Sequence, residues 1–303
     1  MAEQRTNEPR ALAAGTAAYL LWSVFPLYFD LLNAATAAEI VAHRIAWTFV
    51  FCLVGVTVLR SWGHVRAVWA DKKLVGRLAL AGVLVSGNWL IYIWAILHDA
   101  VVDAALGYFI NPLVTVALGL VFLGERLHRL QYLALGVGVV AVAVIIVGYG
   151  RIPWAGLGLA LSFGLYALMK NRVGARATPL VGLGYEAAVL TPLSAAYIVV
   201  LQVSGAGVFL AHGAGMTAGL ALAGAVTATP LLFFAFAAAR LPLATVGMLQ
   251  YMCPIGQFLL GILVFHEPMP TARWIGFGLI WVALILLSAH AIRAYRRPPS
   301  ATS

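Results

Sequence analysis

Apolar residues run along the chain in long blocks, without the alternation of half-buried strands or the one-sided stripes of surface helices. Most blocks are close to the ~20 residues that a helix needs to cross the hydrocarbon core of a membrane. A spanning segment must satisfy its own backbone hydrogen bonds, and a β-barrel would show shorter alternating segments, so each block is predicted to be a helix. The ten predicted spans are 11–32, 38–59, 74–97, 103–123, 130–148, 152–169, 180–201, 214–237, 241–265 and 272–292.

Composition leads to the same class of protein. Of 303 residues, 63% are apolar and 10% are charged, and the mean hydropathy is +0.97. A soluble domain averages roughly 45–50% apolar and about 25% charged residues, and disordered chains are poor in apolar residues. Both classes are therefore excluded, and an all-α membrane protein of ten transmembrane helices is predicted. The first span is interpreted as a retained helix, because its apolar run exceeds the about 7–15 residues of a signal-peptide core.

The charged residues predict how the spans are oriented. Basic residues outnumber acidic ones by 19 to 10, which gives a net charge of +9. Lys and Arg collect in the short cytoplasmic loops of membrane proteins. With the N-terminus in the cytoplasm, sixteen of the nineteen fall on the cytoplasmic side, Arg151 and Arg273 fall outside, and Arg44 lies within the second span. Both termini are therefore predicted to be cytoplasmic, and no nucleic-acid partner is expected.

The sequence repeats itself at an offset of 142 residues. Residues 78–82 recur as residues 220–224, Pro112 aligns with Pro254, and Glu125 aligns with Glu267. This predicts two five-helix repeats, 10–148 and 152–292, and a cytoplasmic tail, 293–303. Because five is odd, the second repeat enters the membrane from the opposite side, and inverted repeats of this kind are a plan of many secondary transporters.

Two ionisable residues inside the spans are the first candidates for a site. Arg44 and Glu186 align at the repeat offset and have opposite charges. Ionisable groups within a membrane are costly and usually face a partner or a polar cavity. Arg44 could hold an anionic or carbonyl-bearing part of a solute with its planar donors, and Glu186 could exchange a proton. The alternatives are an ion pair between them, or two separate side chains that extend to the interface.

Polar side chains in the second and third spans are further candidates. His43 could relay protons, although a histidine that only packs between helices fits the sequence better, because nothing supplies its partner. Asn88 and Tyr92 lie four residues apart and share one helical face. They could contact an amphipathic solute, or Asn88 could join two helices by a hydrogen bond.

Paired prolines in the fourth and ninth spans predict interrupted helices. Pro112, preceded by Asn111, and Pro254 occupy matching positions, and each frees a backbone carbonyl one turn earlier. Interruptions in matching places point to a binding site. Tyr108 and Gln250, one turn before the prolines, could face it. The alternative is a kink that only shapes helix packing.

The remaining polar residues lie near the ends of the spans. Asp99 and Asp103 fall in a short outer loop, where solvated charges are the expectation and a vestibule that attracts cations is the alternative. Glu125 is interpreted as a solvated or paired loop charge, and a gating role together with Glu267 is the alternative. Cys52 and Cys253 are far apart and show no metal-ligand spacing, so neither a metal nor a cofactor is expected.

Several stretches resemble a known family. They are Glu39-x-x-x-His43-Arg44, residues 86–92 (SGNWLIY), residues 106–115 (LGYFINPLVT) and residues 122–126 (FLGER). Together they resemble the EamA branch of the drug/metabolite transporter superfamily, most closely its RarD proteins, over about residues 10–292. The resemblance implies two five-helix EamA units and a permease of the bacterial inner membrane, in a group associated with chloramphenicol sensitivity or resistance. The second half departs from the first in having His266-Glu267 where the first has Gly124-Glu125.

These observations favour a secondary transporter that moves a small metabolite or drug-like solute by alternating access. Export is preferred on family likeness alone, driven by protons or by the solute's own gradient. One alternative is an intramembrane enzyme, but Ser23, His43 and Glu186 form no recognisable catalytic set. The other is a channel or scaffold, for which no charged ring is present. The expected partners are the solute, protons where transport is coupled, and the lipid bilayer; a homodimer is left open.

Overall fold

The chain folds as a bundle of helices in a computed structural model, which describes residues 2–123, 127–238, 240–241 and 243–296. The structure is 84% helix, and the described residues contain no strand. The first half contains α1 (Ala2–Ser23), α2 (Phe25–Asp30), α3 (Ala37–Val58), α4 (Trp62–Ala70), α5 (Lys72–Ile96), α6 (Val101–Leu123) and α7 (Arg129–Tyr149). The second half contains α8 (Trp154–Val173), the short η1 (Gly174–Arg176), α9 (Pro179–Ser204), α10 (Gly213–Ala238), α11 (Leu243–Leu249), α12 (Met252–Leu263) and α13 (Thr271–Arg296).

Each of the ten apolar blocks coincides with helix. Among the described residues, seven helices are long and apolar enough to cross a membrane. Two blocks are divided. The first changes from α1 to α2 at Val24, just before Pro26, whose missing N–H suits the first turn of a new helix. The ninth is divided into α11 and α12 at residues 250–251.

The two prolines expected to interrupt matching helices differ in effect. Pro254 lies in the first turn of α12, immediately after the division of the ninth block. Pro112 lies inside α6, which continues as one helix from Val101 to Leu123. A proline inside a helix removes one hydrogen bond without having to end the helix, because neighbouring helices support the freed backbone in a membrane protein. The interruption is therefore seen in the ninth block and not in the fourth.

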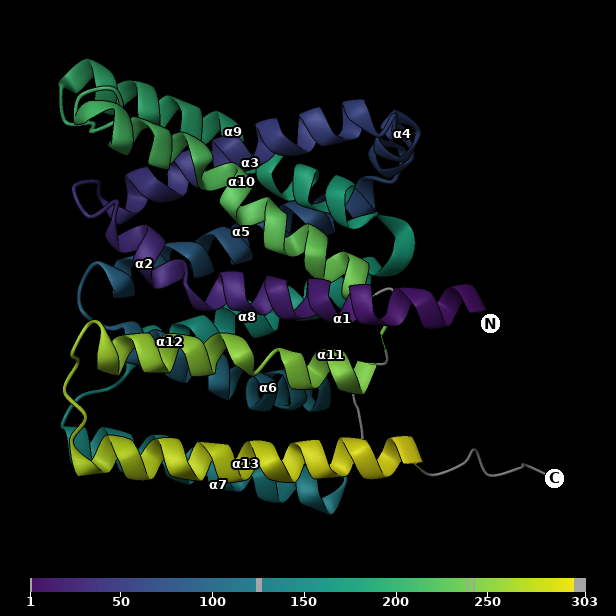
Figure 1. The fold of residues 1–303 in the computed structure, drawn as a ribbon, viewed down its shortest axis with the longest axis vertical. Helices are drawn as coiled ribbons and strands as arrows, with labels where there is room; N and C mark the ends of the chain where they lie inside the picture. The colour runs from purple at the N-terminus through teal and green to yellow at the C-terminus, as the bar shows by residue number, and fades with distance from the viewer. Residues whose placement is uncertain (1, 124–126, 239, 242, 297–303) are drawn as a thin grey trace.

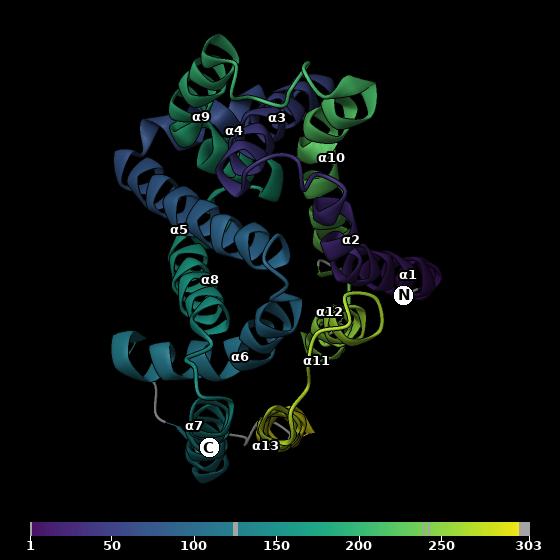
Figure 2. The ribbon, with the colours of Figure 1, turned by 90° about the vertical axis from the view of Figure 1, so that its left-hand side faces the viewer.

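The bundle has two distinct ends. We call the end where α1 begins and α13 ends the terminal end, and the opposite end the distal end (Figure 1). Connections 97–100, 150–153, 205–212 and 264–270 lie at the distal end. Seen from that end, α5, α8 and α6 form one side of the bundle and α10, α1 and α12 the other, with α3 and α9 above and α7 and α13 below (Figure 2).

Helix packing in the two halves follows one pattern. At the offset of 142 residues, α3, α5 and α7 align with α9, α10 and α13, and α6 aligns with α11 and α12 together. By order in the chain, α1 corresponds to α8, although their bounds match less well. The contact of α5 with α8 is matched by that of α10 with α1, and the contact of α3 with α10 by that of α9 with α5. Equivalent helices also contact each other in the pairs α3 with α9, α6 with α12 and α7 with α13.

Two equivalent glycines allow the closest of these approaches. A Cβ atom on Gly82 of α5 would lie 2.4 Å from the backbone oxygen of Glu186 in α9. A Cβ atom on Gly224 of α10 would lie 2.2 Å from the backbone carbon of Trp47 in α3. Small residues at such positions let helix backbones come together, which is how membrane helices gain packing energy.

Candidate binding site

Arg44 lies deep in the bundle and is surrounded by aromatic rings. Arg44 belongs to α3, whose N-cap is Thr36. Its exposed fraction is 4%. Its guanidinium carbon lies 4.1 Å from the ring centroid of Trp89, 5.3 Å from that of Phe29 and 5.7 Å from that of Phe25. We call these three rings the aromatic cage. Its faces attract the cation, and no carboxylate among the described residues pairs with it.

The donors of Arg44 are not used by the protein. Its Nε and Nη1 atoms are buried without a hydrogen-bond partner among the described residues. A buried donor without a partner is costly, and this cost rises for a charged group. Ring faces do not replace the hydrogen bonds of a planar guanidinium, which suit a carboxylate or carbonyl oxygen. The site is therefore chemically incomplete as the protein alone provides it.

Two tyrosines lie near Arg44, and a glutamine lies beside one of them. The ring of Tyr92 in α5 lies 5.7 Å from that of Tyr108 in α6 and 6.1 Å from that of Phe29. Gln257 of α12 lies close to Tyr92, and its Nε2 donates to the backbone oxygen of Trp22 over 3.1 Å. The hydroxyl of Tyr92 and Oε1 of Gln257 are buried and make no hydrogen bond of ordinary geometry with the described residues, although the two side chains lie within reach of each other.

We call Arg44, Tyr92, Tyr108 and Gln257 the central cluster. Its members come from α3, α5 and α6 of the first half and α12 of the second. Three of them carry buried polar atoms without partners, set among aromatic walls. Ligand sites are mostly apolar with a few placed polar groups, and this cluster has that character.

Glu186 is buried elsewhere and has its own partners. Its side chain is 1% exposed; Oε1 lies 2.6 Å from Nζ of Lys170, and Oε2 accepts a hydrogen bond of 3.1 Å from the hydroxyl of Tyr166. Arg44 and Glu186, which align at the repeat offset, therefore form no ion pair with each other. Lys170 follows the predicted span 152–169 directly, and α8 continues past it, so that its Nζ reaches Glu186 of α9.

The remaining sequence candidates have other surroundings. The ring of His43 lies 4.5 Å from that of Phe209, and both its nitrogens are buried without a hydrogen-bond partner in the described part of the chain. Asn88 joins α5 to α8, because its Nδ2 donates to the backbone oxygen of Leu159 over 3.1 Å and to Ser162 over 2.9 Å. Oδ1 of Asn111 is buried without a partner, and Gln250 is exposed between α11 and α12.

Gln257 is a polar residue that sequence analysis missed. It stands in an apolar block one turn after Cys253, with which its amide also makes a contact of 3.3 Å. A glutamine within a predicted span is itself the signal, since polar side chains there face partners or cavities. The repeat offset selects Gln250, which aligns with Tyr108, and does not select Gln257.

A second group of charges ties the halves together at the distal end. Asp103 is 6% exposed and forms a short ion pair with Arg273, with Arg151 at 3.8 Å. The expectation of a solvated loop charge at Asp103 is wrong, because α6 begins at Val101 and turns this carboxylate toward α13. Asp99 is exposed, as expected, and Glu125 lies outside the described residues.

Glu267 and Glu39 each accept a hydrogen bond from a backbone N–H group of the other half of the chain. Both oxygens of Glu267 accept from the N–H of Val102, over 3.1 and 3.2 Å, and Arg273 lies 3.8 Å away. Burial raises the pKa of Glu267 to about 7, against the lowering effect of the N–H of Val102 and the charge of Arg273. Glu39 accepts from the N–H of Val208 over 2.8 Å and from that of Phe209 over 3.4 Å.

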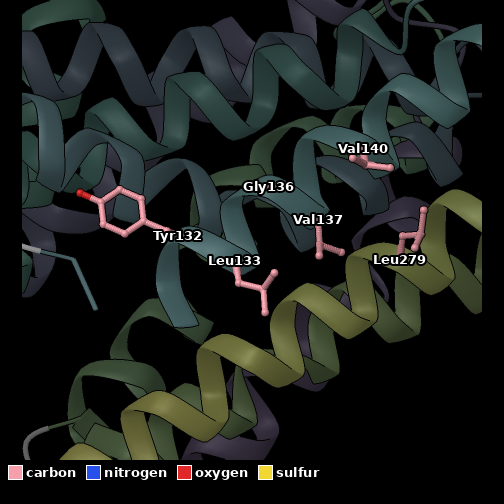
Figure 3. Close-up of a pocket in the computed structure, with 6 residues that line it drawn as sticks. All are labelled: Tyr132, Leu133, Gly136, Val137, Val140 and Leu279. Atoms are coloured by element: carbon pink, nitrogen blue, oxygen red, sulfur yellow. The ribbon is translucent and has the colours of Figure 1, made fainter. Parts of the chain in front are cut away.

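Two surface hollows lie on the bundle, one of them beside Tyr28, whose ring lies 5.1 Å from that of Phe29 in the aromatic cage. One of about 420 Å³ lies between α7 and α13, where apolar side chains surround Gly136 (Figure 3). Its lining residues are Tyr132, Leu133, Gly136, Val137, Val140 and Leu279. Another, of about 400 Å³, lies between α2 and α10, beside Tyr28 and Met216. The first is an apolar outer face of two long helices, with no charged group to orient a polar solute.

Comparison with known proteins identifies relatives over nearly the whole chain. The chain is 46% identical to protein RarD of Streptomyces exfoliatus, over 97% of this chain and 92% of that protein. It is 39% identical to the uncharacterized transporter YojE of Bacillus subtilis, over 98% and 99% of the two chains. Protein RarD of Escherichia coli is 37% identical, over 93% and 94%.

The chain was also compared with solved structures and with family models. A crystal structure described only as that of a protein matches with a TM-score of 0.60 and 20% identity, over 93% of this chain and 98% of the other. That likeness concerns the fold alone. No family model matches the sequence.

Proposed function

Because the chain belongs to the RarD permeases, which are transporters of the EamA type, we propose that it carries a small solute by alternating access between two inverted halves. It is a multi-pass protein of the bacterial inner membrane. The observation that carries the proposal is the central cluster, where buried polar atoms without partners lie between helices of both halves. A solute would supply the missing hydrogen bonds during its passage.

The composition of the cluster indicates the kind of solute. Arg44 offers planar donors to a carboxylate or carbonyl oxygen, and Tyr92 and Gln257 offer a hydroxyl and a carbonyl oxygen. The aromatic cage favours a flat apolar body. We therefore infer an aromatic or amphipathic solute with an anionic or carbonyl-bearing end.

The inverted arrangement of two five-helix halves, 10–148 and 152–292, is supported by the matched helix contacts. The matched glycines Gly82 and Gly224 support it further. Ten spans would then bring both termini to one side. Described basic residues gather at the terminal end, whereas Arg151 and Arg273 lie at the distal end, which supports a cytoplasmic terminal end.

Alternating access requires one end to open while the other closes. At the distal end, Glu267 bonds Val102, Asp103 pairs with Arg273, and Glu39 bonds Val208, each across the two halves. These contacts hold the distal end together in this structure. Opening toward that side would have to break them, and rocking of the halves would replace them with contacts elsewhere.

Proton coupling is proposed for Glu186. This carboxylate is buried, but its partner Lys170 is 33% exposed in its side chain, so the pair connects the interior with the terminal end. Tyr166 provides a second hydrogen-bonding group that can follow a change of protonation. Export would then exchange a solute moving outward for a proton moving inward.

The purified protein in liposomes tests the transport proposal. We expect saturable uptake of an aromatic carboxylate such as phenylpyruvate or benzoate, and weaker uptake of the matching amide. Arg44→Ala and Arg44→Lys should each raise KM about tenfold or more, because hydrogen bonds to a charged group contribute about 1.5–3 kcal/mol. Arg129→Ala, at an exposed position, is the control. Conductance without saturation would identify a channel instead.

Glu186→Gln tests coupling in the same liposomes. The amide keeps the shape of the side chain but cannot release a proton at neutral pH. We expect uptake driven by a pH gradient to disappear while exchange of labelled for unlabelled solute continues. An unchanged response to the pH gradient would remove Glu186 from the coupling mechanism.

A further inference from the structure

Basic side chains gather on two neighbouring connections at the terminal end. The α3–α5 connection and the α8–α9 connection meet there, since Arg77 donates to the backbone oxygen of Arg172 over 3.1 Å and Arg176 lies 3.8 Å from Asp71. Residues 59–77 and 170–178 contain eight Lys and Arg residues but one acidic residue, Asp71. Lys170 is paired with Glu186. We call the other seven the basic patch: Arg60, Arg66, Lys72, Lys73, Arg77, Arg172 and Arg176.

The protein itself hardly neutralises this patch. Asp71 caps α5 by accepting the N–H of Leu74 over 3.0 Å, and it is shared with Arg176. Most of the patch is exposed, including Arg66, Lys72 and Lys73. An uncompensated group of cations attracts anions, and the attraction weakens with salt.

Helix α4 supports the patch with two exposed tryptophans. Its Val68 is 1% exposed and packs in the core, and the backbone oxygen of Val65 accepts a hydrogen bond of 2.9 Å from Tyr185. These contacts fix α4 against the bundle. Trp62 and Trp69 remain 42% and 60% exposed. Arg66 lies four residues after Trp62 and three before Trp69, so the three side chains form one stripe along α4.

The position of the stripe indicates what it contacts. It lies beside the terminal ends of α3 and α5, two helices long and apolar enough to cross a membrane. A membrane that these helices span would have its headgroups at the level of the stripe. Tryptophan prefers this interface, and an amphipathic helix with basic residues binds anionic lipid surfaces. Nζ of Lys72 lies 4.0 Å from the ring centroid of Trp69, so a cation and an interfacial ring are already joined.

We propose that the basic patch and the stripe Trp62–Arg66–Trp69 bind the headgroups of anionic phospholipids. The patch holds the phosphate groups, and the two indole rings lie at the boundary between headgroups and acyl chains. This binding surface is separate from the central cluster, and it does not depend on which solute is carried.

Quenching of tryptophan fluorescence by brominated lipids tests the proposal on the full chain. Wild-type protein is placed in phosphatidylcholine vesicles containing equal fractions of brominated phosphatidylglycerol or brominated phosphatidylcholine. We expect the anionic lipid to quench more strongly. The difference should be lost in Trp62→Phe/Trp69→Phe, which keeps the other seven tryptophans as a background signal.

Charge variants identify the patch. Lys72→Gln/Lys73→Gln should reduce the preference for phosphatidylglycerol at least several-fold, whereas Arg129→Gln/Arg240→Gln, which removes two exposed charges elsewhere, should leave it unchanged. Raising salt on the wild type from about 0.1 to 1 M, which shortens the Debye length from about 10 to 3 Å, should also weaken it. Equal quenching by the two lipids, or equal losses in the two double variants, would overturn the proposal.

Discussion

Arg44 and Glu186 illustrate how differently two buried charges can be accommodated. Arg44 is 4% exposed, and ring faces surround its cation while two of its nitrogens lack hydrogen-bond partners. Glu186 is 1% exposed, but both its oxygens are used by Lys170 and Tyr166. The described residues supply partners for the carboxylate and none for two guanidinium nitrogens, which the proposed solute would occupy. Buried groups left without partners are expected where a protein binds something.

Two tyrosines provide a matched prediction at this scale. The hydroxyl of Tyr92 has no partner in the central cluster, whereas that of Tyr185 donates to Val65 over 2.9 Å. Tyr92→Phe should leave thermal stability in detergent unchanged or higher, and weaken solute affinity about fivefold or more. Tyr185→Phe should lower the free energy of unfolding by about 1 kcal/mol and leave affinity unchanged. Equal effects of both variants on affinity would remove Tyr92 from the site.

The sequence identifies most of these residues but not their partners. Arg44 and Glu186 stand out because charged residues are rare in spans. Their alignment at the repeat offset, however, relates equivalent positions in two halves, and equivalent positions need not be neighbours. The predicted span 152–169 ends just before Lys170, whereas α8 continues to Val173, because hydropathy alone does not locate the end of a helix. Asn88 could serve a solute or another helix, and only the distance to Leu159 identifies the hydrogen bond between helices.

At the scale of elements, the apolar blocks predict helices well because every span must satisfy its own backbone. They predict interruptions less well. A proline ends a helix in some places and only bends it in others. Pro112 and Pro254 therefore look alike in sequence, yet α6 continues through Pro112, whereas Pro254 lies in the first turn of α12. The additional helix α4 falls in a connection that is not apolar enough to be read as a span.

The close approach of equivalent helices leads to a prediction about glycine. Gly82→Ala and Gly224→Ala would place Cβ atoms 2.4 and 2.2 Å from backbone atoms of the neighbouring helices. Overpacking of this kind costs about 1–3 kcal/mol, so both variants should unfold several degrees lower in detergent.

Gly87→Ala provides the control, because nothing lies within 4 Å of its Cβ position. A helical alanine in open space should be neutral or stabilising by up to about 1 kcal/mol. If Gly224→Ala were as stable as Gly87→Ala, the close packing of α10 on α3 would be wrong.

At the scale of the whole molecule, contacts between the two halves join the distal end, and we expect Glu267 to make these contacts sensitive to pH. Burial raises the pKa of this carboxyl to about 7, above its ordinary value near 4.5. The groups facing it are Asp103, Arg273 and the N–H of Val102, with Arg151 beyond Asp103. Because the closed form binds the proton more tightly, this contribution to closure is full below about pH 4.5 and is lost as the pH rises through about 7.

Labelling of a buried cysteine measures this closure. In a background of Cys52→Ala/Cys253→Ala, the variant Ala104→Cys places a thiol at a fully buried position near the distal end of α6. Labelling by a membrane-impermeant maleimide, corrected for the reactivity of the thiol itself, should rise between pH 6 and pH 8. In Glu267→Gln, this rise should be absent. A rise of equal size in the variant would assign the pH dependence to another group.

The unpaired cation of Arg44 has a consequence for the energetics of the whole cycle. A full charge that crosses the membrane field exchanges about 2.3 kcal/mol per 100 mV. If the halves reorient as proposed, the interior without a bound anion carries the positive charge of Arg44, on which the membrane voltage acts. With a carboxylate bound, the net charge at Arg44 is close to zero, and the membrane voltage exerts little force on the site. The electrical potential of the cell should therefore act on the return of the empty carrier and leave the loaded step almost untouched.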